Sequence, residues 1–268
     1  MKPVLKKRLN DLDGKTWLIF SFSIWRDIKK TSEEMKLGHP AIFPVALTSR
    51  IIKIFTKKGD TILDPFMGCG STIISSILEN RKGIGLDLSK EYCEITMNRI
   101  NNLKFKLKNP DFIEPQIYND DARKLLNYIM PESVDLCITS PPYWDILKES
   151  RTADRRKPIS YSNSEKDLGN INNYEIFLEE LKDIFEKVFK VLKSNGYCVV
   201  VVMDIRKRDK FYSFHSDLAQ KLKEIGFLWE DIIIWDRQHE YNNMRPLGYP
   251  YAFRVNKVHE YILIFKKV

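Results

Sequence analysis

The sequence predicts a single α/β domain built around a mostly parallel, seven-stranded sheet. Short apolar runs of strand length recur along the chain and alternate with segments of helical periodicity, the pattern of strand–helix–strand crossovers. The last two runs have no helix between them, so we expect them to pair antiparallel. A chain of 268 residues with 43% hydrophobic content can bury one sizeable core, which favours one domain over residues 1–268.

Each element follows from its local pattern. We expect helices on both faces of the sheet, because the strands of parallel sheets are buried on both sides. The clearest helix is the one ending near residue 193, whose apolar residues recur every three or four positions. The first 35 residues could pack against the sheet as padding or line a groove. The expected strands cover residues 61–66, 83–88, 116–119, 134–138, 197–204, 228–235 and 261–265. The expected helices cover residues 45–55, 73–79, 172–193 and 213–225, and two more begin near residues 90 and 120.

The chain is basic, with a formal net charge of +8. Such a balance suits a polyanionic partner. Basic residues cluster at 148–157 and at 206–210, each time after an expected strand. A solvated basic loop is the plain alternative for either cluster, but the first one directly follows a candidate site and so favours phosphate contacts.

Several classes of protein fit the sequence poorly. No apolar run is long enough to cross a bilayer, and the basic N-terminus lacks a signal core, so we expect a cytoplasmic protein. The cysteines show no paired spacing and lie in or beside apolar patterns, which predicts reduced core residues. The histidines are scattered, so we expect no metal site. The cysteines are Cys69, Cys93, Cys137 and Cys198.

A glycine turn links the first expected strand to the next helix. Residues 64–72 read Asp-Pro-Phe-Met-Gly-Cys-Gly-Ser-Thr. The glycines allow close approach of a ligand, and the helix offers free N–H groups and a positive dipole end. A nucleotide, a phosphate or the methionine part of a sulfonium cofactor would fit, and so would a plain turn.

Acidic residues follow the next two expected strands. Asp87 ends one of them, at the place where an acid typically binds ribose hydroxyls. The alternative is a carboxylate that only stabilises the following helix dipole. Asp120 and Asp121 follow the strand at 116–119, and either could cap a helix or accept from an adenine amino group. We favour Asp121 for the ligand.

The strand at 134–138 ends abruptly at Ser140-Pro141-Pro142-Tyr143-Trp144. Proline cannot continue a strand ladder and restricts the residue before it. A polar and aromatic group is thus presented at a strand's carboxyl end, where open α/β sheets bind ligands.

These motifs together resemble the amino-directed DNA methyltransferases, which transfer a methyl group from S-adenosylmethionine to the exocyclic nitrogen of cytosine or adenine. Residues 39–44 are similar to the family's cofactor-flanking segment, residues 64–72 to its glycine motif, and residues 140–143 to its catalytic tetrapeptide. The resemblance covers nearly the whole chain from Lys36 and implies a Rossmann-like class I methyltransferase fold. Because the cofactor motifs precede the catalytic one, it also implies a circularly permuted order.

The resemblance implies S-adenosylmethionine as cofactor and double-stranded DNA as partner, with a cognate restriction endonuclease as a further candidate partner. Ser140 and the Pro141 carbonyl would accept the amino hydrogens, and Tyr143 would stack on a base flipped out of the duplex. The implied catalytic residues are Ser140, Pro141, Pro142 and Tyr143. The implied cofactor residues are His39, Pro40, Phe43, Asp64, Pro65, Phe66, Gly68, Gly70, Ser71, Thr72, Asp87 and Asp121. The expected DNA contacts are Trp144, Lys148, Arg151, Arg155, Arg156, Lys157, Arg237 and Arg245.

Serine at the first position of the tetrapeptide favours N4 of cytosine over N6 of adenine. The alternatives are an N6-adenine enzyme, an RNA or protein amide methyltransferase, and a catalytically silent nucleic-acid-binding module. The polar segment at about 145–170 is too long for an ordinary connection, and a second polar loop covers about 237–257. No large separate recognition domain remains, so target recognition would fall to these two loops.

Overall fold

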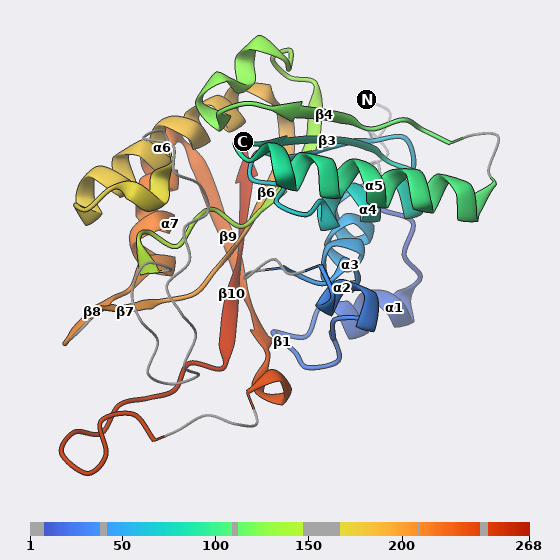
Figure 1. Ribbon diagram of the computed structural model, residues 1–268. Coiled ribbons are helices and arrows are strands. Elements are labelled where there is room, and N and C mark those ends of the chain that lie inside the picture. Colours follow the sequence, from blue (N-terminus) through green and yellow to red (C-terminus); the bar gives the residue numbers. More distant parts are fainter. Residues whose placement is uncertain (1–7, 38–41, 109–111, 147–166, 208, 242–245) are drawn as a thin grey trace, which may run out of the picture.

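The central sheet determines where a ligand can bind. The computed structural model describes residues 8–37, 42–108, 112–146, 167–207, 209–241 and 246–268, and within them the sheet has eight strands in the order β1-β9-β10-β6-β5-β2-β3-β4 (Figure 1). All pairs are parallel except those of β10, which is antiparallel to β6 and β9. The predicted mostly parallel sheet and its antiparallel last strand are confirmed, but the sheet has one strand more than the seven predicted. The strands are β1 (Ile24–Trp25), β2 (Thr61–Asp64), β3 (Lys82–Asp87), β4 (Gln116–Asn119), β5 (Val134–Thr139), β6 (Leu192–Val202), β9 (Phe227–Asp236) and β10 (His259–Lys267).

The strand order reverses between β2 and β5. From β2 the chain proceeds to β3 and β4 on one side, and from β5 it proceeds to β6 on the other. A crevice forms at such a reversal, beyond the carboxyl ends of the strands. The glycine turn follows β2 and the double-proline motif follows β5, so both reach this crevice.

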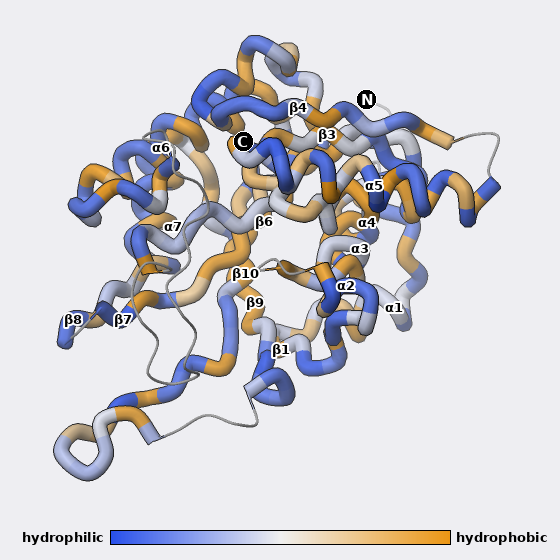
Figure 2. Tube along the Cα trace, viewed as in Figure 1, coloured by the Kyte–Doolittle hydropathy of each residue, from blue (hydrophilic) through white to orange (hydrophobic). Residues whose placement is uncertain are grey.

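Helices cover both faces of the sheet, as predicted (Figure 1). Along β5, Leu136 and Ile138 pack in one core cluster while Cys137 packs in another, so alternate residues serve the two faces. Figure 2 shows the central strands mainly in hydrophobic colours. One face carries α3 (Val45–Phe55), α4 (Ser71–Leu78) and α5 (Lys90–Leu107), and the other carries η1 (Ala122–Asn127), α6 (Tyr174–Val191) and α7 (Phe214–Ile225).

The structure differs from the prediction at three places. The first 35 residues contribute edge strand β1, together with α1 (Gly14–Phe20) and α2 (Ser32–Met35). Strand β6 begins at Leu192, directly after α6, and contains an irregularity where Asn195 has a φ of 64°. A small hairpin of β7 (Ile205–Lys207) and β8 (Lys210–Tyr212) occupies the second basic cluster. Among the described residues, no helix has the length and apolar character needed to span a bilayer.

Candidate functional site

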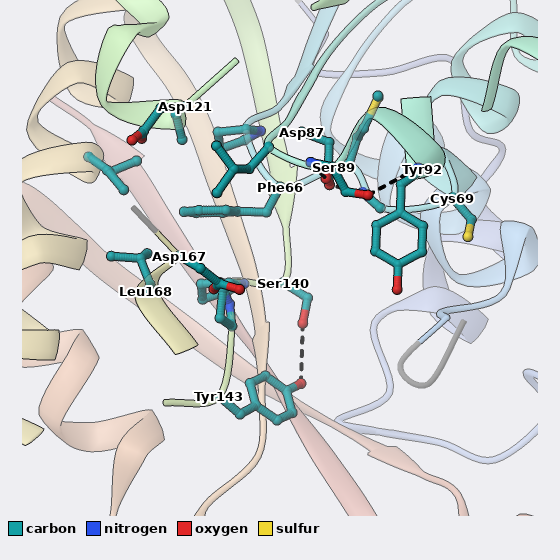
Figure 3. Close-up of a pocket in the computed structure, with 18 of the residues that line it drawn as sticks. Phe66, Cys69, Asp87, Ser89, Tyr92, Asp121, Ser140, Tyr143, Asp167 and Leu168 are labelled. Atoms are coloured by element: carbon teal, nitrogen blue, oxygen red, sulfur yellow. Dashed lines mark hydrogen bonds between the residues drawn. The ribbon is translucent and has the colours of Figure 1, made fainter. Parts of the chain in front are cut away.

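A cavity lies at the reversal point of the sheet and brings most of the described candidate residues together. It encloses about 1030 Å³, counting the part that is open to solvent. Figure 3 shows Asp87 and Asp121 on one side of it and Ser140 and Tyr143 on the other. The predicted site residues that line it are Phe43, Pro65, Phe66, Gly68, Ser71, Asp87, Asp121, Ser140, Pro141, Pro142 and Tyr143.

The glycine turn is fixed by α5 behind it. Thr96 Oγ1 donates to the Gly68 carbonyl at 3.1 Å, and Arg99 Nη1 donates to the Cys69 carbonyl. Gly70 has a φ of 75°, and a Cβ there would lie 2.4 Å from Thr96 Cγ2. Gly70 is therefore needed for packing and backbone conformation, and it does not line the cavity.

Asp64 also lies behind the cavity wall. Its two oxygens accept from Thr72 Oγ1 and Thr139 Oγ1, each at 2.7 Å, and Oδ1 also accepts from the Phe66 N–H at 3.1 Å. Burial raises the pKa of Asp64 to about 6. Asp64 and Thr72 thus connect the ends of β2 and β5 to the start of α4. Their geometry gives them a supporting position, in contrast to the predicted direct cofactor contact.

Asp87 ends β3 with its carboxylate at the cavity. Oδ2 accepts from the Gly68 N–H at 2.9 Å, and Oδ1 accepts from the Ser89 N–H at 2.8 Å. Burial raises its pKa to about 6 although both backbone bonds favour the charged form. Each oxygen keeps a further lone pair, so the group can accept from ligand hydroxyls while it orders the glycine turn.

Asp121, and not Asp120, lines the cavity. Asp121 caps η1 by accepting from the Arg123 N–H at 2.9 Å, and it pairs with Arg123 Nη1 at 2.8 Å. Asp120 instead binds Lys124 and Tyr128 on the exposed side of the turn. Of these two neighbouring acids, Asp121 is therefore the one placed where a ligand could reach it.

A chain of hydrogen bonds holds the double-proline segment, residues 140–143, in place. Ser140 Oγ donates to the Tyr143 hydroxyl at 3.2 Å, and that hydroxyl donates to Glu260 Oε2 at 3.1 Å. Glu260 Oε1 in turn accepts from Arg237 Nη1. Burial and the charge of Glu260 raise the pKa of Tyr143 well above its ordinary value, so the phenol keeps its proton. Because Ser140 Oγ uses its proton in the bond to Tyr143 and lines the cavity, it can serve there as an acceptor.

Two residues that were predicted to contact DNA have partners within the protein. Trp144 is 5% exposed, its Nε1 donates to the Ile171 carbonyl at 2.7 Å, and its ring packs on Tyr174 and Tyr212. Arg237 pairs with Glu240 and Glu260. The buried indole and the paired guanidinium contradict the predicted roles of these two residues as surface DNA contacts.

Some predicted residues lie outside the described part of the chain, and two functional candidates were missed. Asp167 lines the cavity and caps a short turn by accepting from the Gly169 N–H at 2.9 Å. Its polar surroundings gave no signal, whereas Glu260 was visible as a charge at the start of an apolar strand. Outside the described residues are His39, Pro40, Lys148, Arg151, Arg155, Arg156, Lys157 and Arg245.

The glycine turn alone would fit a nucleotide, a phosphate or a sulfonium cofactor. The charges of the cavity distinguish among these ligands. Three carboxylates line it, those of Asp87, Asp121 and Asp167, and none of its described lining residues is Lys or Arg. Carboxylates repel a phosphate and attract a cation. Apolar lining from Phe66 and Ile184 suits a flat ring. A cofactor with a sulfonium, an ammonium and ribose hydroxyls fits these residues better than a phosphate does.

Parts of this chain are similar to known methyltransferases. M.BamHII of Bacillus amyloliquefaciens, an orphan methyltransferase, is 38% identical over 37% of this chain and 40% of its own. The type II methyltransferase M.BglI of Bacillus subtilis is 34% identical over 34% of this chain and 26% of its own. The putative DNA modification methylase TTHA0409 of Thermus thermophilus, solved with S-adenosyl-L-methionine, is 29% identical over 55% of this chain and 53% of that chain, with a TM-score of 0.39.

These matched segments span at most about half the length of each relative named. The family model reaches further along the chain. It is the model of the DNA methylase family N6_N4_Mtase, and it matches residues 5–98 and 134–268, which include the glycine turn, Asp87 and the tetrapeptide. The chain therefore belongs to the DNA methylase family.

Proposed function

We propose that this chain transfers a methyl group from S-adenosylmethionine to the exocyclic N4 of a cytosine that is flipped out of double-stranded DNA. The observation that carries the proposal is that residues 140–143, which follow β5, and Asp87, which ends β3, line one cavity. Membership of the DNA methylase family supports the reaction type. The preference for cytosine rests on Ser140, because serine at this position favours N4-cytosine in the family that the motifs resemble.

Positioning and electrostatics carry the catalysis. An exocyclic amino nitrogen is a poor nucleophile because its lone pair is delocalised into the base. Ser140 Oγ and the Pro141 carbonyl accept its two hydrogens and so orient the lone pair. Tyr143 stacks on the extruded base. S-adenosylmethionine, when bound, supplies the activated methyl group, and Asp87 and Asp121 hold its ribose and adenine.

The base specificity has a direct test. Purified chain is incubated with DNA and S-adenosylmethionine, and the DNA is digested to nucleosides and separated by mass spectrometry. We expect N4-methylcytosine. Recovery of N6-methyladenine alone would replace the cytosine proposal with the adenine one, while methylation of RNA or protein only would assign the chain to those substrates.

Cofactor binding distinguishes the proposed enzyme from the alternative of a catalytically silent nucleic-acid-binding module. Calorimetric titration with S-adenosylmethionine should show binding to the wild-type chain, and an absence of binding would support the module.

The names of relatives such as M.BglI suggest a restriction–modification setting. Sequencing host DNA with and without the gene would identify the methylated site. Recognition by residues 145–170 and 237–257, a partner endonuclease and the circularly permuted motif order stay predictions.

Glu260 positions Tyr143 in this proposal. Glu260→Gln should lower methyl transfer roughly tenfold, because the amide can donate to the phenol and reverse the chain that leaves Ser140 as acceptor. The affinity for S-adenosylmethionine should stay unchanged by calorimetry. Glu240→Gln is the matched control, since Glu240 also pairs with Arg237 but does not bond Tyr143. Equal losses in the two variants would show that only the Arg237 ion pairs matter.

Cofactor binding should weaken as the pH falls from about 7 to about 5. The pKa of Asp87 is raised to about 6, so this carboxylate becomes neutral over that range and accepts ribose hydroxyls poorly. Its effect on folding has the opposite sign: a folded-state pKa above the unfolded value makes acidification stabilising through this group. Calorimetry across the range measures the affinity. Asp87→Asn should bind weakly at every pH, which separates Asp87 from Asp64. A pH-independent wild type would contradict this prediction.

A further inference from the structure

Residues 246–258, which we call the arm, leave the amino end of β10 and extend away from the sheet (Figure 1). Leu247 and Arg254 form an isolated antiparallel bridge across it. At its tip the N–H groups of Tyr251 and Ala252 donate to the Gly248 carbonyl at 2.8 and 2.7 Å. Gly248 has a φ of 76°, which favours glycine. The turn is therefore held by its own backbone and does not need its side chains.

Those side chains are large, aromatic and almost fully exposed. Tyr249 is 78% exposed, Tyr251 94% and Phe253 96%. Single exposed apolar residues are ordinary, but three rings grouped on one projection indicate a surface that meets a partner. Figure 2 shows hydrophobic and hydrophilic stretches along this projection.

Cations accompany the rings. Arg254 of the arm pairs with Asp209, which connects the arm to the β7–β8 hairpin. On that hairpin Phe211 is 48% exposed, and its ring centre lies 5.7 Å from Arg206 Cζ and 5.1 Å from Lys257 Nζ. Burial and the charge of Arg206 lower the pKa of Lys257. A bound anion would reduce the repulsion between these two like charges, which are held at one ring.

We propose that the arm and the β7–β8 hairpin together form a DNA-binding surface. Tyr251 and Phe253 stack on bases, while Arg206, Lys210 and Lys257 bind the neighbouring phosphates. Aromatic rings beside cations are the combination by which proteins hold nucleic acid strands. The surface begins at the same edge of the sheet as the catalytic cavity, because Glu260, just after the arm, bonds Tyr143. The choice of DNA rests on the proposed function.

Fluorescence anisotropy tests the surface on the full chain. The probes are a labelled random-sequence DNA duplex and the corresponding single strand. Tyr251→Ala/Phe253→Ala should weaken binding to the single strand roughly tenfold or more, the loss expected from base-stacking rings, and should weaken binding to the duplex less, because paired bases are already stacked on one another. The matched control is Phe105→Ala/Met130→Ala, which removes two side chains that are 79% and 75% exposed and lie before β4 and β5, at the opposite edge of the sheet. The control should bind like the wild type.

The salt dependence of binding distinguishes the contribution of the aromatic rings from that of the cations. Lys210→Gln should reduce the slope of log affinity against log salt by about one, whereas the double aromatic variant should keep the wild-type slope. Unchanged affinity of the double variant would overturn the proposal, and so would a change in its sedimentation behaviour without a change in DNA binding, which would indicate a protein interface. Methyl transfer is measured separately. If the chain transfers no methyl group but the double variant loses binding, the arm stands and the proposed function fails; the reverse result rejects the arm alone.

Discussion

Tyr143→Ala is expected to slow methyl transfer roughly a hundredfold while leaving the affinity for S-adenosylmethionine within about twofold. The substitution removes the ring that stacks on the base in the proposed mechanism. It also removes the hydroxyl that accepts from Ser140 at 3.2 Å and donates to Glu260 at 3.1 Å. Single-turnover methylation measures the first effect and calorimetry measures the second.

Tyr143→Phe divides this loss into its two parts. Phenylalanine keeps the ring and its edge-on contact with Phe214 at 6.1 Å, and it lacks only the hydroxyl. Its activity should therefore lie between those of the wild type and Tyr143→Ala. If Tyr143→Ala weakened cofactor binding as much as it slowed transfer, the division of roles between Tyr143 and Asp87 would be wrong.

Asp87→Ala is expected to raise the dissociation constant for S-adenosylmethionine roughly ten- to a hundredfold, the effect of losing hydrogen bonds to a charged group. The Gly68 and Ser89 N–H groups lose their acceptor at the same time, so the glycine turn is less ordered. Calorimetric titration measures the affinity, and thermal unfolding checks that the variant is folded.

Asp120→Ala is the control for this experiment. It removes a carboxylate at the same edge of the sheet that points away from the cavity, toward Lys124 and Tyr128. Its cofactor affinity should match that of the wild type. An Asp87→Ala protein with wild-type affinity would exclude Asp87 from the ribose site.

The strands were predictable because their signal is local. A run such as Val134–Thr139 is largely apolar and is stopped by two prolines, and a parallel strand buried on both faces needs no more than that. Strand β1 was not predictable. It has two residues and forms only because its partner β9 offers a free edge, so the information lies in the distant strand.

The residues of the site also fall into those whose place the local sequence predicts and those whose place it does not. The positions of Asp87 and Ser140 at the cavity could be predicted, because one lies at the end of a strand and the other at the start of a turn. The charge of Glu260 stands out at the start of an apolar strand, but its contact with Tyr143 could not be predicted, because that bond joins residues that are far apart along the chain. Trp144 and Arg237 look like surface contacts in the sequence, but an indole N–H and a guanidinium can also be satisfied inside a protein by a carbonyl or by carboxylates.

The carboxylates of the cavity have a consequence for how a nucleic acid approaches. The chain carries a net charge of +8, yet Asp87, Asp121 and Asp167 give the cavity the opposite sign. The outer surface therefore attracts a polyanion, while the interior repels its phosphates. In the proposed function an uncharged base would enter, while the backbone that carries it would stay at the rim. The cavity would then select by charge, admitting a base and excluding the phosphates of its strand.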